Sequence, residues 1–241
     1  LLRNGFDLTV RDLNKEFVDE FVERGAKSGS SPKEMAEHCD VMITCLPSPK
    51  ACSVVMESKD GILAGLSKGK IWLEMSTTDE AEIRRIGALV DKVGALPIDC
   101  PVSGGCHRAD TGNISIFAGC KREAFELALP ILTTMGRRVL HTGDLGTAST
   151  LKVMTNYLAT VNLTSIAEAL TTMKSLGMDM NVTYEAIKAS SGNSFVHETE
   201  SQVILNGSRD ISFTMDLVSK DVGIFNQLAE RKGIELEIAP L

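Results

Sequence analysis

The sequence predicts an α/β domain built on a parallel sheet, followed by an all-α domain. Up to about residue 146, short runs that are apolar throughout alternate with helical patterns. Such runs are typical of strands buried on both faces of a parallel sheet, and their alternation with helices indicates a doubly wound layer. After Gly146 the pattern is helical only. We therefore expect one domain over residues 1–146 and a second over residues 147–241.

The strands of the first domain are expected where short apolar runs stop at turn residues or charges. The clearest run covers residues 41–46 and ends at Pro47, which has no N–H to donate to a ladder. The expected strands are residues 8–11, 41–46, 71–74, 96–99, 114–118 and 139–141.

Start and stop residues delimit the expected helices. A helix over 15–24 ends at Gly25, and another begins with Ser31 as its N-cap and Pro32 at its first position. The longest pattern covers 149–176 and stops at Gly177; ~28 residues at 1.5 Å each give roughly 42 Å, which favours a spine linking two domains. Further helices are expected over residues 182–189, 199–205 and 212–232.

Composition excludes several classes of function. The formal net charge is −7 and no basic cluster occurs, which argues against nucleic-acid binding. No apolar stretch is long enough to span a membrane. The six cysteines contain no Cys-x-x-Cys pair, which favours reduced thiols and a cytoplasmic location. The four histidines lack metal-like spacing, so no metal site is expected.

A Ser-Gly-Gly loop is the first candidate for chemistry. Ser103, Gly104 and Gly105 would expose backbone N–H groups and a hydroxyl to the oxygen atoms of a ligand, because glycine has no side chain in the way. An ordinary strand-to-helix turn is the alternative.

The second candidate is a pair on the long predicted helix. Lys152 and Asn156 are four residues apart, so they share one face. Lys152 could move a proton and Asn156 could hold a polar group of a small molecule. The alternatives are a surface lysine and a buried amide that satisfies a neighbouring helix.

Three segments resemble the signature motifs of the β-hydroxyacid dehydrogenase family. This family includes 3-hydroxyisobutyrate dehydrogenase and, more distantly, 6-phosphogluconate dehydrogenase. They are residues 99–112, 143–156 and 213–221. The resemblance implies a Rossmann-type domain, a homo-oligomer formed through the helical domain, and NAD as cofactor, with NADP possible. It also implies that Lys152 is catalytic and that Ser103, Gly104, Gly105 and Asn156 bind the substrate.

The resemblance assigns five residues to the cofactor: Asp12, Leu46, Pro47, Thr77 and Lys220. Asp12 follows an expected strand, where a carboxylate accepts hydrogen bonds from a ribose and repels a 2′-phosphate; the preceding Arg11 weakens this preference for NAD. The other interpretations are a helix cap or turn residue for Asp12, a strand end for Leu46 and Pro47, a helix cap for Thr77, and for Lys220 an exposed ion pair with Asp221.

The family pattern also implies segments outside this sequence. A first strand with its Gly-x-Gly-x-x-Gly turn would precede Leu1, and further helices would follow Leu241, so we expect a fragment that lacks both ends. The implied activity is hydride transfer between NAD and a small β-hydroxy acid or its semialdehyde. The alternatives are a reductase of tartronate or succinic semialdehyde, and a cofactor-binding scaffold without catalysis.

Overall fold

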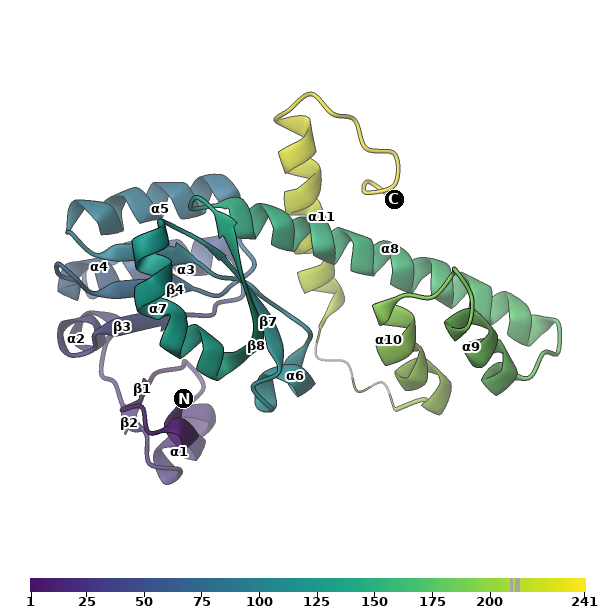
Figure 1. Cartoon of the computed structure of the whole chain (residues 1–241), viewed down its shortest axis with the longest axis horizontal. Coiled ribbons are helices and arrows are strands. Elements are labelled where there is room, and N and C mark those ends of the chain that lie inside the picture. Colours follow the sequence, from purple (N-terminus) through teal and green to yellow (C-terminus); the bar gives the residue numbers. More distant parts are fainter. Residues whose placement is uncertain (209, 211–212) are drawn as a thin grey trace. The chain divides into compact units, whose positions relative to one another are not determined.

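The computed structural model describes residues 1–208, 210 and 213–241 and divides into two compact units, Leu1–Lys152 and Val153–Leu241. All the strands of the described chain lie in the first unit, whereas the second is helical (Figure 1). The division falls within the longest helix, α8 (Thr147–Ser175).

The first unit alternates strands with helices, as the apolar runs predict. Its strands are β1 (Thr9–Val10), β2 (Lys27–Ser28), β3 (Val41–Thr44), β4 (Ile71–Glu74), β5 (Leu96–Asp99), β6 (Val102–Ser103), β7 (Ile114–Gly119) and β8 (Gly136–Gly143). Its helices are the short 3₁₀ turn Leu2–Asn4, then α1 (Lys15–Glu23), α2 (Pro32–His38), α3 (Pro49–Glu57), α4 (Ile62–Gly65), α5 (Glu80–Lys92), α6 (Cys106–Asp110) and α7 (Arg122–Met135).

The larger sheet is mixed rather than purely parallel. Strands β3, β4 and β5 run parallel, and β8 is parallel to β7. Strand β7, however, runs antiparallel to both β5 and β6. The predicted α/β domain with a largely parallel sheet is confirmed, and β7 is its antiparallel exception, because the short β6 and its loop return the chain beside β5 without a full crossover helix.

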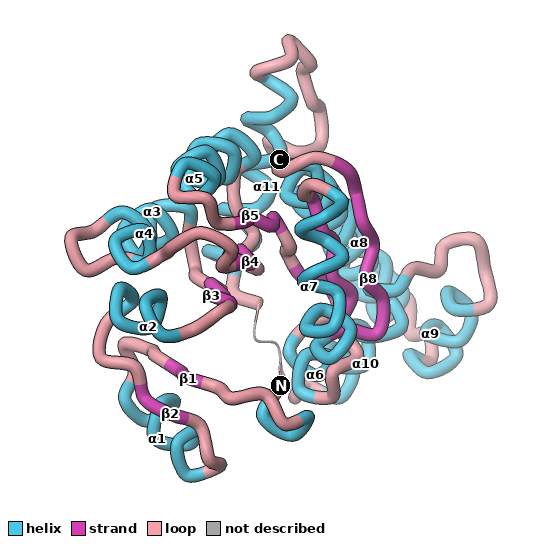
Figure 2. Tube along the Cα trace, turned by 60° about the vertical axis from the view of Figure 1, so that its left-hand side comes forward, coloured by secondary structure: helices cyan, strands magenta, loops and turns pink. Residues whose placement is uncertain are grey.

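Helices cover both faces of this sheet (Figure 2). Strand β4 shows why, since all four of its residues are buried. Ile71 and Leu73 point into a core shared with α7, whereas Trp72 between them points into a second core shared with α2, α3, α4 and α5. Burial on both faces explains why these strands are apolar throughout.

The strand predicted over residues 8–11 is present as β1, but it belongs to a separate small sheet. Strand β1 pairs in parallel with β2, and among the described residues no ladder joins this pair to the sheet of β3 to β8. Strand β3 is the edge of that larger sheet. The further strand expected from the family pattern stays a prediction.

The local signals for helices are confirmed in the first unit. Ser31 accepts a hydrogen bond from the Glu34 N–H at 3.1 Å, and Pro32 opens α2. Gly25 follows α1 with a positive φ of 101°, a conformation that glycine adopts without strain.

The second unit contains the part of α8 after Lys152 together with α9 (Met180–Lys188), α10 (Phe195–Asn206) and α11 (Met215–Glu230). Helix α8 has 29 residues, so the long helix is confirmed. The helix predicted over 212–232 is observed as α11, two to three residues shorter at each end; its predicted start, Ser212, lies outside the described residues.

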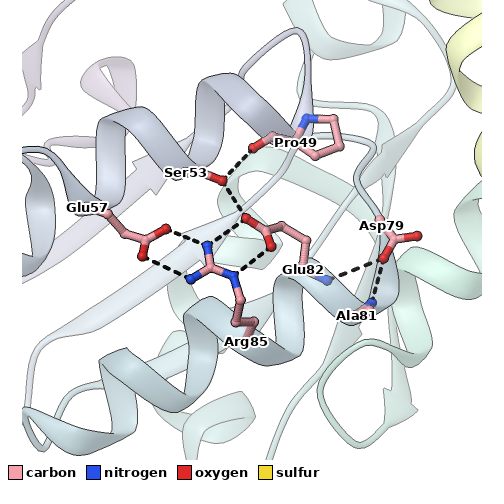
Figure 3. A network of polar contacts seen from close by, with 7 residues as sticks. All are labelled: Pro49, Ser53, Glu57, Asp79, Ala81, Glu82 and Arg85. Atoms are coloured by element: carbon pink, nitrogen blue, oxygen red, sulfur yellow. Dashed lines mark hydrogen bonds and ion pairs between the residues drawn. The ribbon is translucent and has the colours of Figure 1, made fainter.

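An ion-pair network joins α3 to α5 in the first unit (Figure 3). Arg85 lies between Glu57 and Glu82 and bonds to both carboxylates, while Ser53 donates to Glu82. These bonds lower the pKa of both glutamates, Arg85 being the largest cause for each. Because Arg85 is about half exposed, the network contributes little to folding compared with the two cores.

Candidate active site

Lys152 lies near the start of α8 and is 7% exposed, so the alternative of a surface lysine is wrong. Ala148 and Ser149, in the first turn of the helix, are fully buried. The backbone of Gly119 at the end of β7 packs closely here, because a Cβ on that residue would lie 2.8 Å from the Asp144 carbonyl oxygen. The start of α8 is thus seated against strand ends of the sheet.

The Ser-Gly-Gly loop has a backbone that requires glycine. Ser103 ends β6, and Gly104 and Gly105 follow with φ values of +132° and +80°. A Cβ on Gly104 would also lie 2.9 Å from Cδ of Arg108. The two glycines therefore leave their backbone N–H groups accessible to the oxygen atoms of a ligand. An ordinary turn would show the same φ values.

We expect Gly105→Ala to destabilise the protein by about 1–3 kcal/mol and to raise KM for the substrate, because a side chain is strained at this φ and the loop must shift. Chemical denaturation and steady-state kinetics measure the two effects. Gly207→Ala is the matched control, since Gly207 also has a positive φ of 70° with no atom near its Cβ position, but it ends α10. An unchanged KM in Gly105→Ala would contradict a role for the loop in substrate binding.

In the second unit, Asp221 links two of the predicted site residues. Nδ2 of Asn156 donates to Oδ2 of Asp221 at 2.6 Å, and Nζ of Lys220 lies 2.9 Å from Oδ1 of the same carboxylate. Asp221 is only 2% exposed, so the interpretation of an exposed ion pair is wrong. The alternative for Asn156, an amide that satisfies a neighbouring helix, predicts this hydrogen bond to α11. The role of Asn156 in substrate binding therefore stays a prediction.

Asp12 lies two residues beyond the end of β1 and is exposed. Its Oδ1 accepts a hydrogen bond from the Asn14 N–H at 2.8 Å, so Asp12 is a turn residue, while Asn14 caps α1. The preceding Arg11 donates to the carbonyl oxygen of Ser30 at 2.9 Å, and this bond holds its guanidinium toward the end of β2. An exposed carboxylate beside a strand end fits a ribose diol.

The remaining cofactor candidates of this unit follow the carboxyl ends of β3 and β4. Leu46 and Pro47 come two residues after β3, and the Leu46 N–H donates to the Ser76 hydroxyl at 2.7 Å. Thr77 follows β4 by three residues; it is not the cap of α5, a role that belongs to Asp79. The hydroxyl of the neighbouring Thr78 is buried without a hydrogen-bond partner.

These residues fit a dinucleotide. Ligands of open α/β sheets bind beyond the carboxyl ends of parallel strands, where Asp12, Leu46, Pro47 and Thr77 all lie. A carboxylate for the ribose, apolar side chains and an unsatisfied buried hydroxyl form a donor and acceptor set that suits a nicotinamide nucleotide. Such a cofactor supplies hydride transfer.

Sequence reasoning missed two buried carboxylates at the same ends. Glu74 accepts hydrogen bonds from Thr44, Cys52 and the Ser76 N–H, and it ties β3, β4 and α3 together. Asp99 accepts two hydrogen bonds from Ser149. The sequence did contain a signal for both: each carboxylate is the last residue of an apolar run that is predicted to be buried.

Burial governs the titration of groups in this region. It raises the pKa of Asp99 to about 6, against the opposing effect of the hydrogen bonds from Ser149. It also raises the pKa values of the Cys52 and Cys100 thiols well above their ordinary value. All six cysteines are free.

Among the described residues, no group of three or more His, Cys, Asp or Glu side chains is arranged to hold a metal ion. No helix in the described part of the chain combines the length and apolarity needed to cross a membrane.

Two family models match almost the whole chain. The first describes the NAD binding domain of 6-phosphogluconate dehydrogenase and covers residues 1–143. The second describes the NAD-binding domain of NADP-dependent 3-hydroxyisobutyrate dehydrogenase and covers residues 146–241.

Individual relatives agree with these models. The chain is 33% identical to the NAD-dependent L-serine dehydrogenase of Pseudomonas aeruginosa, over 95% of this chain and 80% of that one. It is 31% identical to mitochondrial 3-hydroxyisobutyrate dehydrogenase of Mus musculus, over 93% and 69%. A solved structure of 3-hydroxyisobutyrate dehydrogenase from Salmonella typhimurium matches with a TM-score of 0.89 at 26% identity, over 99% and 84%.

The family models and the relatives thus define an NAD(P)-dependent oxidoreductase that acts on CH–OH groups. The chain belongs to the β-hydroxyacid dehydrogenase family, and the resemblance seen in its three motifs is confirmed.

Proposed function

We propose that the protein transfers a hydride between NAD and a small β-hydroxy acid or its semialdehyde, in the manner of 3-hydroxyisobutyrate dehydrogenase. The observation that carries this proposal is the buried Lys152, which lies near the anchored start of α8 and one turn before Asn156. The family membership and the names of the relatives, which act on 3-hydroxyisobutyrate and L-serine, support it.

Each residue has a distinct part in this proposal. Lys152 removes the proton of the substrate hydroxyl during oxidation and returns it in the reverse direction. Ser103, Gly104 and Gly105 hold the substrate carboxylate, and Asn156 holds the polar group beside the reacting carbon. Asp12, Leu46, Pro47, Thr77 and Lys220 hold the cofactor, and Asp221 orients Lys220 through the ion pair at 2.9 Å.

The two parts of the chain divide this work. We assign residues 1–146 to dinucleotide binding, with the Ser103 loop as their contribution to the substrate, and residues 147–241 to substrate binding and to assembly of a homo-oligomer, with Lys220 as their contribution to the cofactor. Exposed apolar side chains on α8, α9 and α10 support assembly, since Leu158, Val182 and Phe195 are 50%, 60% and 51% exposed. The six free cysteines support a reducing, cytoplasmic location.

A substrate panel tests the proposed activity. Purified protein is assayed with NAD and with 3-hydroxyisobutyrate or L-serine, and in reverse with NADH and tartronate or succinic semialdehyde, with products identified by mass spectrometry. Preferred turnover of a hydroxy acid supports the proposal, and preferred turnover of a short semialdehyde favours the reductase alternative. Cofactor binding without turnover of any β-hydroxy acid or semialdehyde would identify a scaffold instead.

We expect NAD to be used more efficiently than NADP, and Asp12→Ser to reduce or reverse that preference. The exposed carboxylate of Asp12 repels a 2′-phosphate, and Arg11 is engaged with Ser30 rather than placed to compensate. Initial rates with both cofactors give the ratio of kcat/KM. Glu23→Gln removes an exposed carboxylate at the far end of α1 and is the control. Higher efficiency with NADP in the unchanged protein would show that Arg11 governs the choice.

A further inference from the structure

The carboxylate of Asp99 is fully buried at the last position of β5. Its hydrogen bonds go to the start of α8: the backbone N–H of Ser149 donates to Oδ2 at 2.8 Å, and the Ser149 hydroxyl donates to Oδ1 at 2.6 Å. Both carboxylate oxygens therefore accept hydrogen bonds from the same residue of the helix.

This contact replaces a local helix cap. The first N–H groups of a helix lack partners within the helix, and a side chain just before the helix usually accepts from one of them. For α8 the acceptor comes from 50 residues earlier in the chain, on the sheet. The negative charge of the carboxylate is also favourable beside the positive end of the helix.

The two hydrogen bonds to Ser149 also constrain the position of Lys152, which is three residues further along the same helix. Residues at this spacing are neighbours on one face, separated by about 4.5 Å along the axis. Two bonds to two oxygens of one carboxylate fix the rotation of the helix as well as its axial position. A rotation of the first turn would carry the Lys152 side chain away from its place.

Other side-chain contacts at the start of α8 hold Thr147 rather than Ser149. The Thr147 hydroxyl shares a hydrogen bond with the Thr142 hydroxyl of β8 and donates to the Asp144 carbonyl oxygen, both at 2.7 Å. Glu74 lies opposite Asp99 in register on β4, and its hydrogen bonds hold Thr44, Cys52 and Ser76, which lie outside α8. Gly119 lets β7 approach the turn before α8 closely, but it supplies no side chain. Burial raises the pKa of Asp99 to about 6, so at neutral pH the group is still mainly a carboxylate that accepts both bonds.

We propose that Asp99 is a positioning residue for the dehydrogenase reaction: its carboxylate, through Ser149, sets the orientation of the first turns of α8 and so the place from which Lys152 moves a proton. The inference rests on the proposed role of Lys152. It requires no contact between Asp99 and the substrate or cofactor.

The test compares Asp99→Ala, Asp99→Asn, Ser149→Ala and Lys152→Ala in the whole protein, using the best substrate of the panel above. We expect Asp99→Ala to lower kcat by roughly 10- to 100-fold, because misplacement of a reacting group by about 1 Å costs up to this much, while KM for NAD changes less than about 3-fold. Ser149→Ala removes only the hydroxyl bond, so it should fold and show a smaller loss of kcat.

Asp99→Asn separates geometry from charge. An asparagine can accept from the Ser149 N–H through Oδ1 and donate to the Ser149 hydroxyl through Nδ2, so we expect kcat within about 3-fold of the unchanged protein. Asp91→Ala removes an exposed carboxylate on α5 and controls for a general loss of negative charge. Thermal unfolding of every variant ensures that assays are run on folded protein.

The outcomes distinguish this inference from the proposed function. Unchanged kcat in both Asp99→Ala and Ser149→Ala, with Lys152→Ala inactive, overturns the positioning role alone. Loss of activity in Asp99→Asn equal to that in Asp99→Ala also overturns it, since the charge and not the hydrogen-bond geometry would then matter. Near-normal activity of Lys152→Ala overturns the proposed function itself.

Discussion

Lys152→Ala is expected to lower turnover by roughly 10²- to 10⁴-fold, the usual effect of removing a general acid or base. Lys152 is buried near the start of α8, whose first turn is held by Asp99, so no other side chain can move into its place without a shift of the helix. The measurement is kcat for the best substrate of the panel, with the product identified. KM for NAD should change little, because no cofactor contact is assigned to this lysine.

The control for this variant is Lys174→Ala. Lys174 lies in the last turn of the same helix and is exposed, so its removal changes the net charge equally and should leave kcat unchanged. Lys152→Arg adds a second comparison, because arginine keeps the charge but cannot give up its proton near neutral pH. Near-normal turnover in Lys152→Ala would remove this residue from the reaction.

Trp72→Ala is expected to lower the free energy of unfolding by about 3–5 kcal/mol, the range for truncating a large buried aromatic side chain. Trp72 is fully buried in the core that joins β4 to the helices α2 to α5, and its Nε1–H donates to the Thr44 hydroxyl at 2.9 Å. Removal of the ring leaves a cavity and deprives that hydroxyl of a donor. Denaturant unfolding followed by circular dichroism measures the change.

Trp72→Phe separates packing from hydrogen bonding. It keeps most of the apolar volume and loses only the bond to Thr44, so a loss of about 1 to 2 kcal/mol is expected. Equal losses in the two variants would show that the hydrogen bond, which belongs to the group of contacts around Glu74, dominates over the volume of the ring.

The sequence alone determined the alternation of strands and helices in the first unit and the helical character of the second. Strands β4 and β5 lie exactly at the predicted residues, because strands buried on both faces need apolar side chains at every position. Helix α8 and its stop at Gly177 followed from apolar periodicity and from a glycine with a φ of 77°. The motifs around Lys152 and the Ser-Gly-Gly loop sufficed to predict the family and the class of reaction, since these depend on residue types at fixed spacings.

Only the tertiary structure decided how strands pair and which polar groups meet. The antiparallel course of β7 could not be predicted, because an apolar run has the same pattern in either direction. The separate pair β1 and β2 depends on hydrogen bonds between segments about 18 residues apart, which periodicity does not encode. The same holds for Asp99 with Ser149 and for Asn156 with Asp221, which are 50 and 65 residues apart: burial makes each of these hydrogen bonds necessary, but only the fold selects the partner.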